Sequence, residues 1–194
     1  MKYLILIAAI IVSTKIVPKE QSPVKYYSIQ DKDKLVSDQK GYFWCWAASM
    51  EGIFRYFDEN LSQEEIIKTH YNKKYITPND YLSSNMALYP KDSHKYFKLI
   101  KKAKMVLPSN LELAILDGKP ILALYKSHMS IITGYRIIDN KISFELMDPA
   151  YKKVNSRSPF RFVSREDLLY KYQNTNLGNR IPSQLIQIHQ INRR

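Results

Sequence analysis

The chain has 194 residues, of which 45% are hydrophobic and 25% charged, the proportions of a globular domain with a hydrophobic core. It carries 30 lysines and arginines against 18 acidic residues, a formal net charge of +12. The lysines are scattered and no nucleic-acid-binding motif accompanies them, so we expect no nucleic-acid partner. With one cysteine, the chain can form neither an internal disulfide nor a multi-cysteine zinc site.

The N-terminus combines a basic residue with an apolar run. Lys2 precedes Leu4–Val12, which has the length of a signal-peptide core and is too short for a comfortable membrane-spanning helix. We therefore expect residues 1–20 to be a signal peptide or an N-terminal membrane anchor and residues 24–194 to form the folded domain. The protein is accordingly expected to be secreted, or periplasmic or membrane-anchored through its N-terminus. A buried N-terminal strand stays open as the alternative, and a lipoprotein is excluded because no cysteine follows the run.

The first half of the domain is predicted to be helical after an extended entry segment. Residues 13–38 are polar and contain two prolines, which indicates extended chain. A helix over residues 44–57 follows, because apolar side chains recur at helical spacing: Trp46, Met50, Ile53 and Phe57. Ser62 and Glu65 have the spacing of a capping box, which predicts a second helix to about His70.

The middle of the chain gives fewer signals. Residues 71–108 are expected to be irregular, with short helices near 93–103. Ser109 and Asn110 are placed to cap a short helix over residues 111–116, which ends at Asp117-Gly118.

The second half of the chain is predicted to form strands. Five segments have strand character: residues 120–125, 129–138, 141–147, 160–163 and 184–188. Asp139-Asn140 is expected to be the turn of a hairpin, and residues 165–172 a helix between the last two strands. Helices first and an antiparallel sheet later give an α+β fold, with the active centre between the two halves.

The most informative stretch surrounds the single cysteine. Gln39 is followed, after five intervening residues, by Cys45-Trp46-Ala47-Ala48. Cys45 lies at the predicted start of a helix, where backbone N–H groups and the helix dipole stabilise a thiolate, the form of cysteine that attacks a carbonyl carbon. Gln39 is close enough to turn its side-chain N–H toward an oxyanion that develops beside the backbone N–H of Cys45.

These residues resemble the signature of papain-like cysteine peptidases. Residues 127–135, in which His128 opens a strand that leads to Gly-Tyr, are similar to the histidine strand of that family, and Phe144 to Asp148-Pro149 resemble the segment that orients the histidine. The resemblance implies an α+β, papain-like fold, in which an N-terminal helical half carrying the cysteine packs on a C-terminal antiparallel sheet carrying the histidine and the aspartate. It implies a Cys45–His128–Asp148 triad, Gln39 in the oxyanion hole, a protein or peptide substrate, and no metal or organic cofactor.

The chain departs from the plant papains and cathepsins in three ways. His128 follows Cys45 by 83 residues rather than by roughly 130–150. The Cys-Gly-Ser-Cys-Trp pattern is absent, and Asp148 stands where papain has an asparagine. These features are more similar to compact bacterial relatives: staphopain-like enzymes, bacteriocin-leader peptidases or the effector proteases of plant pathogens. An endopeptidase, a papain-fold amidase or transferase (deamidase, transglutaminase-like or cell-wall amidase) and an inactive binding scaffold all stay open.

Each candidate residue also has a purely structural interpretation. Cys45 can be a core thiol, His128 a strand-end core histidine, Asp148 the start of an Asp-Pro turn, and Gln39 a polar loop residue. The other histidines, His70, His94 and His189, do not precede a strand that ends in Gly-Tyr, which favours His128.

The register of the hairpin decides whether His128 and Asp148 can meet. A two-residue turn at Asp139-Asn140 pairs residue 128 with residue 151 and places Asp148 on the opposite face. A three-residue loop or one bulge pairs residue 128 with residue 150 and restores the shared face.

Overall fold

The structure is a computed structural model that describes residues 23–86, 99–125, 128–153, 156–168 and 184–192. The signal peptide or anchor expected over residues 1–20 lies outside these ranges, as do His94 and most of the helix expected near residues 93–103. No helix within these ranges is long and apolar enough to cross a membrane.

The elements described in full are three α-helices, four short 3-10 helices and seven strands. Residues 165–168 are also helical, where the helix over residues 165–172 was predicted to begin, and the rest of that segment lies outside the described residues. The α-helices are α1 (Cys45–Tyr56), α2 (Gln63–Tyr71) and α3 (Leu111–Leu116). The 3-10 helices are η1 (Lys32–Leu35), η2 (Pro78–Tyr81), η3 (Ser84–Met86) and η5 (Pro108–Asn110). The strands are β1 (Lys25–Ser28), β2 (Ile100–Met105), β3 (Ile121–Tyr125), β4 (His128–Ile138), β5 (Lys141–Met147), β6 (Phe160–Ser164) and β7 (Gln184–Ile191).

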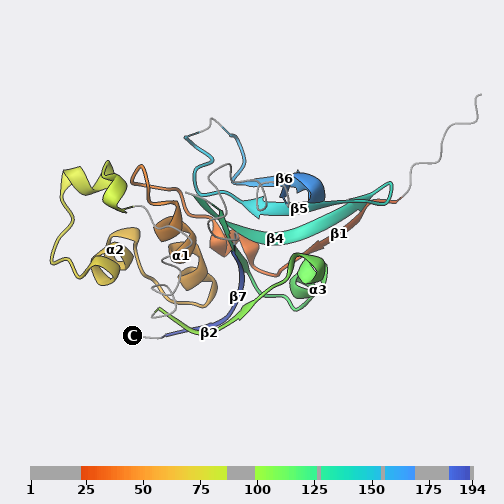
Figure 1. Cartoon of the computed structure of the whole chain (residues 1–194), viewed down its shortest axis with the longest axis horizontal. Helices are drawn as coiled ribbons and strands as arrows, with labels where there is room; N and C mark the ends of the chain where they lie inside the picture. The colour runs from red at the N-terminus through yellow and green to blue at the C-terminus, as the bar shows by residue number, and fades with distance from the viewer. Residues whose placement is uncertain (1–22, 87–98, 126–127, 154–155, 169–183, 193–194) are drawn as a thin grey trace, which may run out of the picture.

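All seven described strands belong to one antiparallel sheet. The order is β2-β7-β3-β4-β5-β6, and β1 pairs with the second half of β4. The helices α1 and α2 lie at one end of the molecule, while β4, β5 and β6 extend toward the other end (Figure 1). This arrangement confirms the α+β, papain-like fold, with the helical half packed on the sheet.

The sheet is covered on both faces. Side chains of α1 and α2 pack on one face against residues such as Leu122, Met129 and Ile131. On the other face, α3 packs against a second cluster that includes Ile132 and Phe144. Because neighbouring residues of a strand point to opposite faces, β3 and β4 contribute to both clusters, and their residues 121–124 and 129–135 are buried.

The helix predictions are confirmed where local signals were strong. In α1, Trp46, Met50 and Ile53 are buried. The helix α2 begins with the complete capping box of Ser62 and Glu65. The helix α3 spans the predicted residues, although the side chain of Asn110 makes no capping hydrogen bond.

One prediction of secondary structure is wrong, since residues 100–103 belong to β2 rather than to a helix. The entry segment is extended at residues 25–28, where it forms the strand β1, but turns into the 3-10 helix η1 at residues 32–35. The strand β1 approaches β4 closely because Gly134 has no side chain: a Cβ there would lie 2.4 Å from the carbonyl oxygen of Tyr27. Contacts between distant parts of the chain therefore determine both strands.

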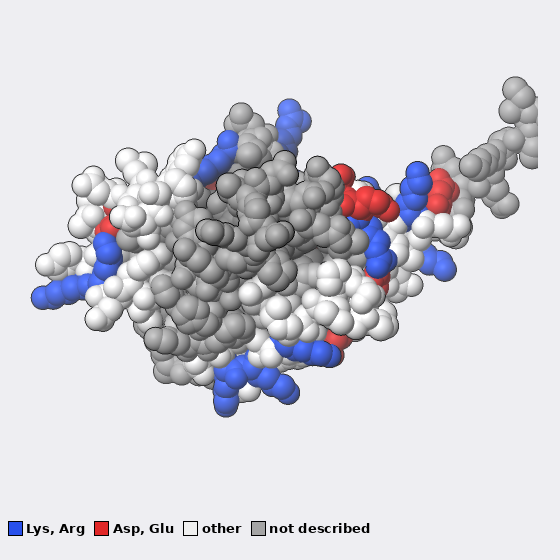
Figure 2. Space-filling view, in the orientation of Figure 1, with Lys and Arg blue, Asp and Glu red and all other residues white. Residues whose placement is uncertain are grey.

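The lysines and arginines are distributed over separate parts of the surface. On the face in Figure 2, the described basic side chains form several groups along the margin, with acidic side chains among some of them. No single basic stripe runs across the described part of this face.

Candidate active site

Cys45 is the first residue of α1, as the sequence predicts. The helix begins without a polar cap, and packing of the preceding residue defines the start instead. Trp44 is buried, stacks on Tyr81 with ring centroids 4.4 Å apart, and donates its indole N–H to the carbonyl oxygen of Asp80 at 3.2 Å. Gly41 makes room for this ring, since a Cβ there would lie 2.5 Å from it. The loop before Cys45 is thereby held in place.

His128 and Asp148 come from the β4–β5 hairpin, which combines a two-residue turn with one bulge. Asp139 and Asn140 form the two-residue turn, with φ values of 47° and 60°. The pairing then shifts by one residue between Ile132 and Gly134, so that Thr133 is a β-bulge. The bulge places His128 and Asp148 on one side of the sheet.

A buried polar network stabilises this bulge. The Thr133 hydroxyl donates to one carboxylate oxygen of Glu145 at 2.8 Å, and Lys32 pairs with the other at 2.6 Å. The Thr133 carbonyl oxygen accepts the backbone N–H of Ile29 at 2.8 Å. The extra residue therefore has hydrogen-bonding partners, which a bulge requires in a buried sheet.

His128 lies between Cys45 and Asp148. Its Nε2 atom is 2.8 Å from Oδ1 of Asp148, and the ring also forms a side-chain hydrogen bond with Cys45, for which Nδ1 is the remaining nitrogen. Burial alone would lower the pKa of His128, but the hydrogen bonds and charges of Asp148 and Cys45 raise it to about 9. An imidazolium is thus favoured at neutral pH.

Asp148 has two further partners besides His128. Burial would raise the pKa of its carboxyl group, but the hydrogen bond with His128 and the nearby cations lower it. Oδ1 accepts the backbone N–H of Ala150 at 3.0 Å, and Oδ2 accepts from Arg161 of β6 at 2.9 Å. Arg161 therefore fixes the orientation of the carboxylate that holds the histidine ring.

Gln39 is buried in the loop before Cys45 and is hydrogen-bonded within that loop. Its amide donates both hydrogens to backbone carbonyls, to Gly41 at 2.8 Å and to Tyr42. The backbone N–H of Gln39 donates to Pro149 at 2.9 Å, which joins the loop before Cys45 to the segment after Asp148. To donate to an oxyanion, the side chain has to exchange one of its two carbonyl acceptors for it.

The structure thus brings Cys45, His128 and Asp148 into one hydrogen-bonded chain and joins Gln39 to Pro149, the residue after Asp148. Two basic residues of the site were not predicted, Arg161 on β6 and Lys153 on the turn after Pro149. Arg161 reaches Asp148 from the neighbouring strand, and Lys153 reaches Gly41 from far along the chain. Neither residue belongs to a sequence pattern that indicates such a contact.

The role of Asp148 can be tested by two substitutions. Asp148→Ala is expected to lower kcat/KM by about 100-fold, because His128, whose acid–base role is worth about 10²–10⁴-fold, loses the acceptor that orients it. Asp148→Asn should lose less, because its oxygen can still accept from Nε2 while its NH₂ group faces Arg161 unfavourably. An imidazolium carries protons on both nitrogens, so the amide does not force a wrong tautomer.

The same experiment includes a compensating variant. Adding Arg161→Gln to Asp148→Asn gives the NH₂ group an amide oxygen to donate to, and part of the lost activity should return. Thermal melting would confirm that each variant is folded. Wild-type rates in both single variants would make Asp148 a turn residue only.

Comparison with known proteins places these observations in a family. A family model described as "Peptidase_C39 like family" matches residues 22–176. The crystal structure of UfSP from C. elegans is similar at a TM-score of 0.45 and 12% identity, covering 87% of this chain and 34% of that one. The chain thus spans about a third of that protein. No curated protein sequence matches.

Proposed function

Because the chain belongs to the Peptidase_C39 like family, we propose that it is a cysteine endopeptidase that hydrolyses peptide bonds with Cys45 as its nucleophile. The observation that carries the proposal is the position of His128, hydrogen-bonded to both Cys45 and Asp148, with a pKa of about 9. This arrangement supports a thiolate–imidazolium pair, which is the reactive form of a cysteine nucleophile.

In the first half of the reaction, the Cys45 thiolate attacks the peptide carbonyl carbon and forms a tetrahedral oxyanion. The His128 imidazolium then donates a proton to the leaving amine, the C–N bond breaks, and an acyl-enzyme remains on sulfur. Asp148, held by Arg161, keeps the ring oriented between the sulfur and the amine. This requires no metal or organic cofactor.

In the second half, neutral His128 removes a proton from water, and the resulting hydroxide attacks the thioester. The acid product leaves, and the thiolate and imidazolium are regenerated. A papain-fold transferase would differ only in the acceptor of the acyl group, which is an amine in place of water. A deamidase would differ in the bond attacked, which is a side-chain amide in place of a peptide bond.

Gln39 is proposed to hold the oxyanion together with the backbone N–H of Cys45. Gln39→Ala is expected to lower kcat by about 100–1000-fold with little change in KM, the usual loss for one such donor. Alkylation of Cys45 by iodoacetamide forms no oxyanion, so its rate should stay at the wild-type value. A loss in kcat below about threefold, or an equal loss in alkylation, would assign Gln39 to the support of its loop.

The activity itself can be tested with a diverse peptide library, with cleavages read by mass spectrometry. New termini that appear with wild type and not with Cys45→Ala would establish an endopeptidase. A mass increase of about 1 Da at glutamine without cleavage would indicate a deamidase, and joined peptides a transferase. A chain that neither reacts with peptides nor reacts with a thiol-directed chloroacetamide would be an inactive binding scaffold.

We also propose that the protein acts outside the cytoplasm or at a membrane, on the basis of the apolar run at Leu4–Val12. Expressed in a bacterial host, the full chain should be exported or membrane-associated, while a chain starting near Gln21 should stay soluble in the cytoplasm. Cell fractionation measures both. Recovery of the full chain from the cytoplasm alone would contradict the proposal.

A further inference from the structure

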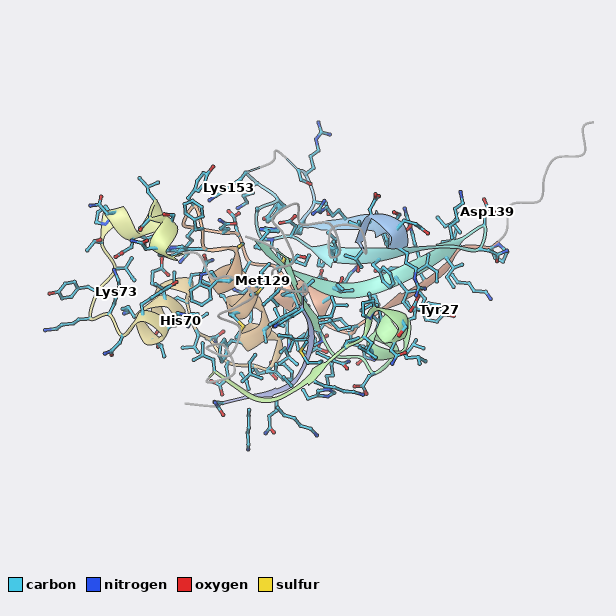
Figure 3. All side chains as sticks on the ribbon, in the orientation of Figure 1. Tyr27, His70, Lys73, Met129, Asp139 and Lys153 are labelled. Atoms are coloured by element: carbon cyan, nitrogen blue, oxygen red, sulfur yellow. The ribbon has the colours of Figure 1, made fainter. Side chains whose placement is uncertain are left out.

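Lys153 lies beside Gln39, the residue proposed to hold the oxyanion. Its ammonium group donates to the carbonyl oxygen of Gly41 at 3.0 Å, and the same oxygen accepts the Gln39 amide at 2.8 Å. The ammonium also lies 5.1 Å from the centre of the Tyr42 ring. Figure 3 shows Lys153 above α1, where the loop before Cys45 meets the turn after Asp148.

The charge of Lys153 is not neutralised by the described protein. The neighbouring Lys152 pairs with Asp38 at 2.9 Å, whereas no carboxylate of the described residues lies within ion-pair distance of Lys153. An ammonium has three N–H donors, and the Gly41 carbonyl accepts one of them. The side chain is exposed, so a substrate can reach the remaining donors.

The loop that Lys153 contacts leads to the nucleophile, because Gly41 lies four residues before Cys45. Partial desolvation lowers the pKa of Lys153, and the negative charges of Asp38 and Cys45 oppose this effect. A partly desolvated ammonium without a carboxylate partner favours an anionic ligand, because the ligand supplies the missing charge and hydrogen bonds.

We propose that Lys153 binds a carboxylate of the substrate beside the scissile bond, so that the enzyme selects peptides with an acidic residue or a free C-terminus there. The inference rests on the proposed peptidase function. The carboxylate would accept from the two remaining ammonium donors, while Tyr42, which is exposed beside the ammonium, would contact the adjoining part of the substrate. Lys153 is then a specificity residue and takes no part in bond breaking.

Peptide cleavage tests this selectivity directly. Matched peptides carry Glu, Gln or Lys on either side of a cleaved bond, and one series ends two residues beyond it with a free or an amidated C-terminus. We expect wild type to favour a carboxylate by about tenfold in kcat/KM. The Glu/Gln arm and the free/amidated arm distinguish a side-chain from a terminal carboxylate.

Lys153→Met should remove the preference, so that the ratio of kcat/KM between the Glu and Gln peptides falls from about ten to about one. Lys153→Glu should reverse it toward Lys-containing peptides. Lys152→Met, which removes the neighbouring charge, should keep the wild-type preference. Equal ratios in wild type and Lys153→Met would overturn the proposal, as would a uniform loss with every peptide.

A second measurement does not depend on peptidase activity. Iodoacetate and iodoacetamide both alkylate the single cysteine, but iodoacetate carries a carboxylate where iodoacetamide carries a neutral amide. The alkylation rate with iodoacetate divided by the rate with iodoacetamide therefore reports anion binding beside Cys45. This ratio should fall several-fold in Lys153→Met and stay unchanged in Lys152→Met. If wild type cleaves no peptide but this ratio falls, the endopeptidase proposal fails and the anion site stands; an unchanged ratio rejects the anion site.

Discussion

Replacing Cys45 with alanine is expected to abolish peptide hydrolysis and thiol labelling while the fold stays intact. The chain contains one cysteine, so no second thiol can replace the nucleophile or take up the label. Cys45 is 5% exposed and is followed by Ala47 and Ala48 in a buried part of α1, so a smaller side chain is compatible with the site. Hydrolysis rates, labelling stoichiometry by mass spectrometry and thermal melting give the result.

Ser49→Ala provides the matched control for Cys45→Ala. Ser49 lies one turn further along α1, is fully buried and touches β4 through a 3.4 Å hydrogen bond to the carbonyl oxygen of Met129. The substitution Ser49→Ala perturbs the same helix but leaves the thiol of Cys45 in place, so activity should persist. Turnover retained by Cys45→Ala would reject both the nucleophile and the family-based mechanism.

Replacing His128 with alanine is expected to lower kcat/KM by about 10²–10⁴-fold, because the leaving amine loses its acid and the attacking water its base. Alkylation of Cys45 at pH 7 should slow as well, since the thiolate loses its partner cation. His189→Ala is the control: that side chain is 22% exposed against 24% for His128 and lies 3.7 Å from Asp117. Activity close to wild type in His128→Ala would exclude it as the base.

The same histidine predicts how the wild-type enzyme responds to pH. His128 loses its proton as the pH rises through about 9, so kcat/KM should fall over that range. The folded-state pKa lies above the ordinary value of 6.5, so this group stabilises the fold fully below about pH 6.5 and the contribution is lost as the pH rises through about 9. Activity and melting temperature measured from pH 6 to 10 should therefore decline together.

The elements predicted from the sequence are those with local signals. The helix α2 follows a capping box, α1 shows apolar spacing, and the hairpin turn has two residues that tolerate positive φ. The strands β1 and β2 carry no such signal: their burial patterns do not alternate, and each is stabilised by a partner far along the chain, β4 for β1 and β7 for β2.

The site was predictable only in part for a similar reason. The resemblance to papain-like peptidases selected Cys45, His128 and Asp148. Counting residues along the hairpin showed that His128 and Asp148 share a face only with a bulge or a longer loop, but it did not locate the bulge. The bulge lies at Thr133 because Glu145 and Lys32 are available to stabilise it, and Lys32 is 113 residues away from Glu145. Contacts over such distances have no signature in a single sequence.

The network at Thr133 has a consequence for the order of folding. The pairing of His128 with Asp148 requires the bulge, and the bulge uses Ile29, which directly follows β1, and Lys32 of η1. The loop before Cys45 is joined to Pro149 only when both halves have docked. Such non-local contacts are the slow ones to form, because their loops cost the most entropy to close. A nascent chain that has left the ribosome only as far as α2 has its cysteine but neither base nor orienting carboxylate. Catalytic competence should therefore be among the last properties that the folding chain acquires.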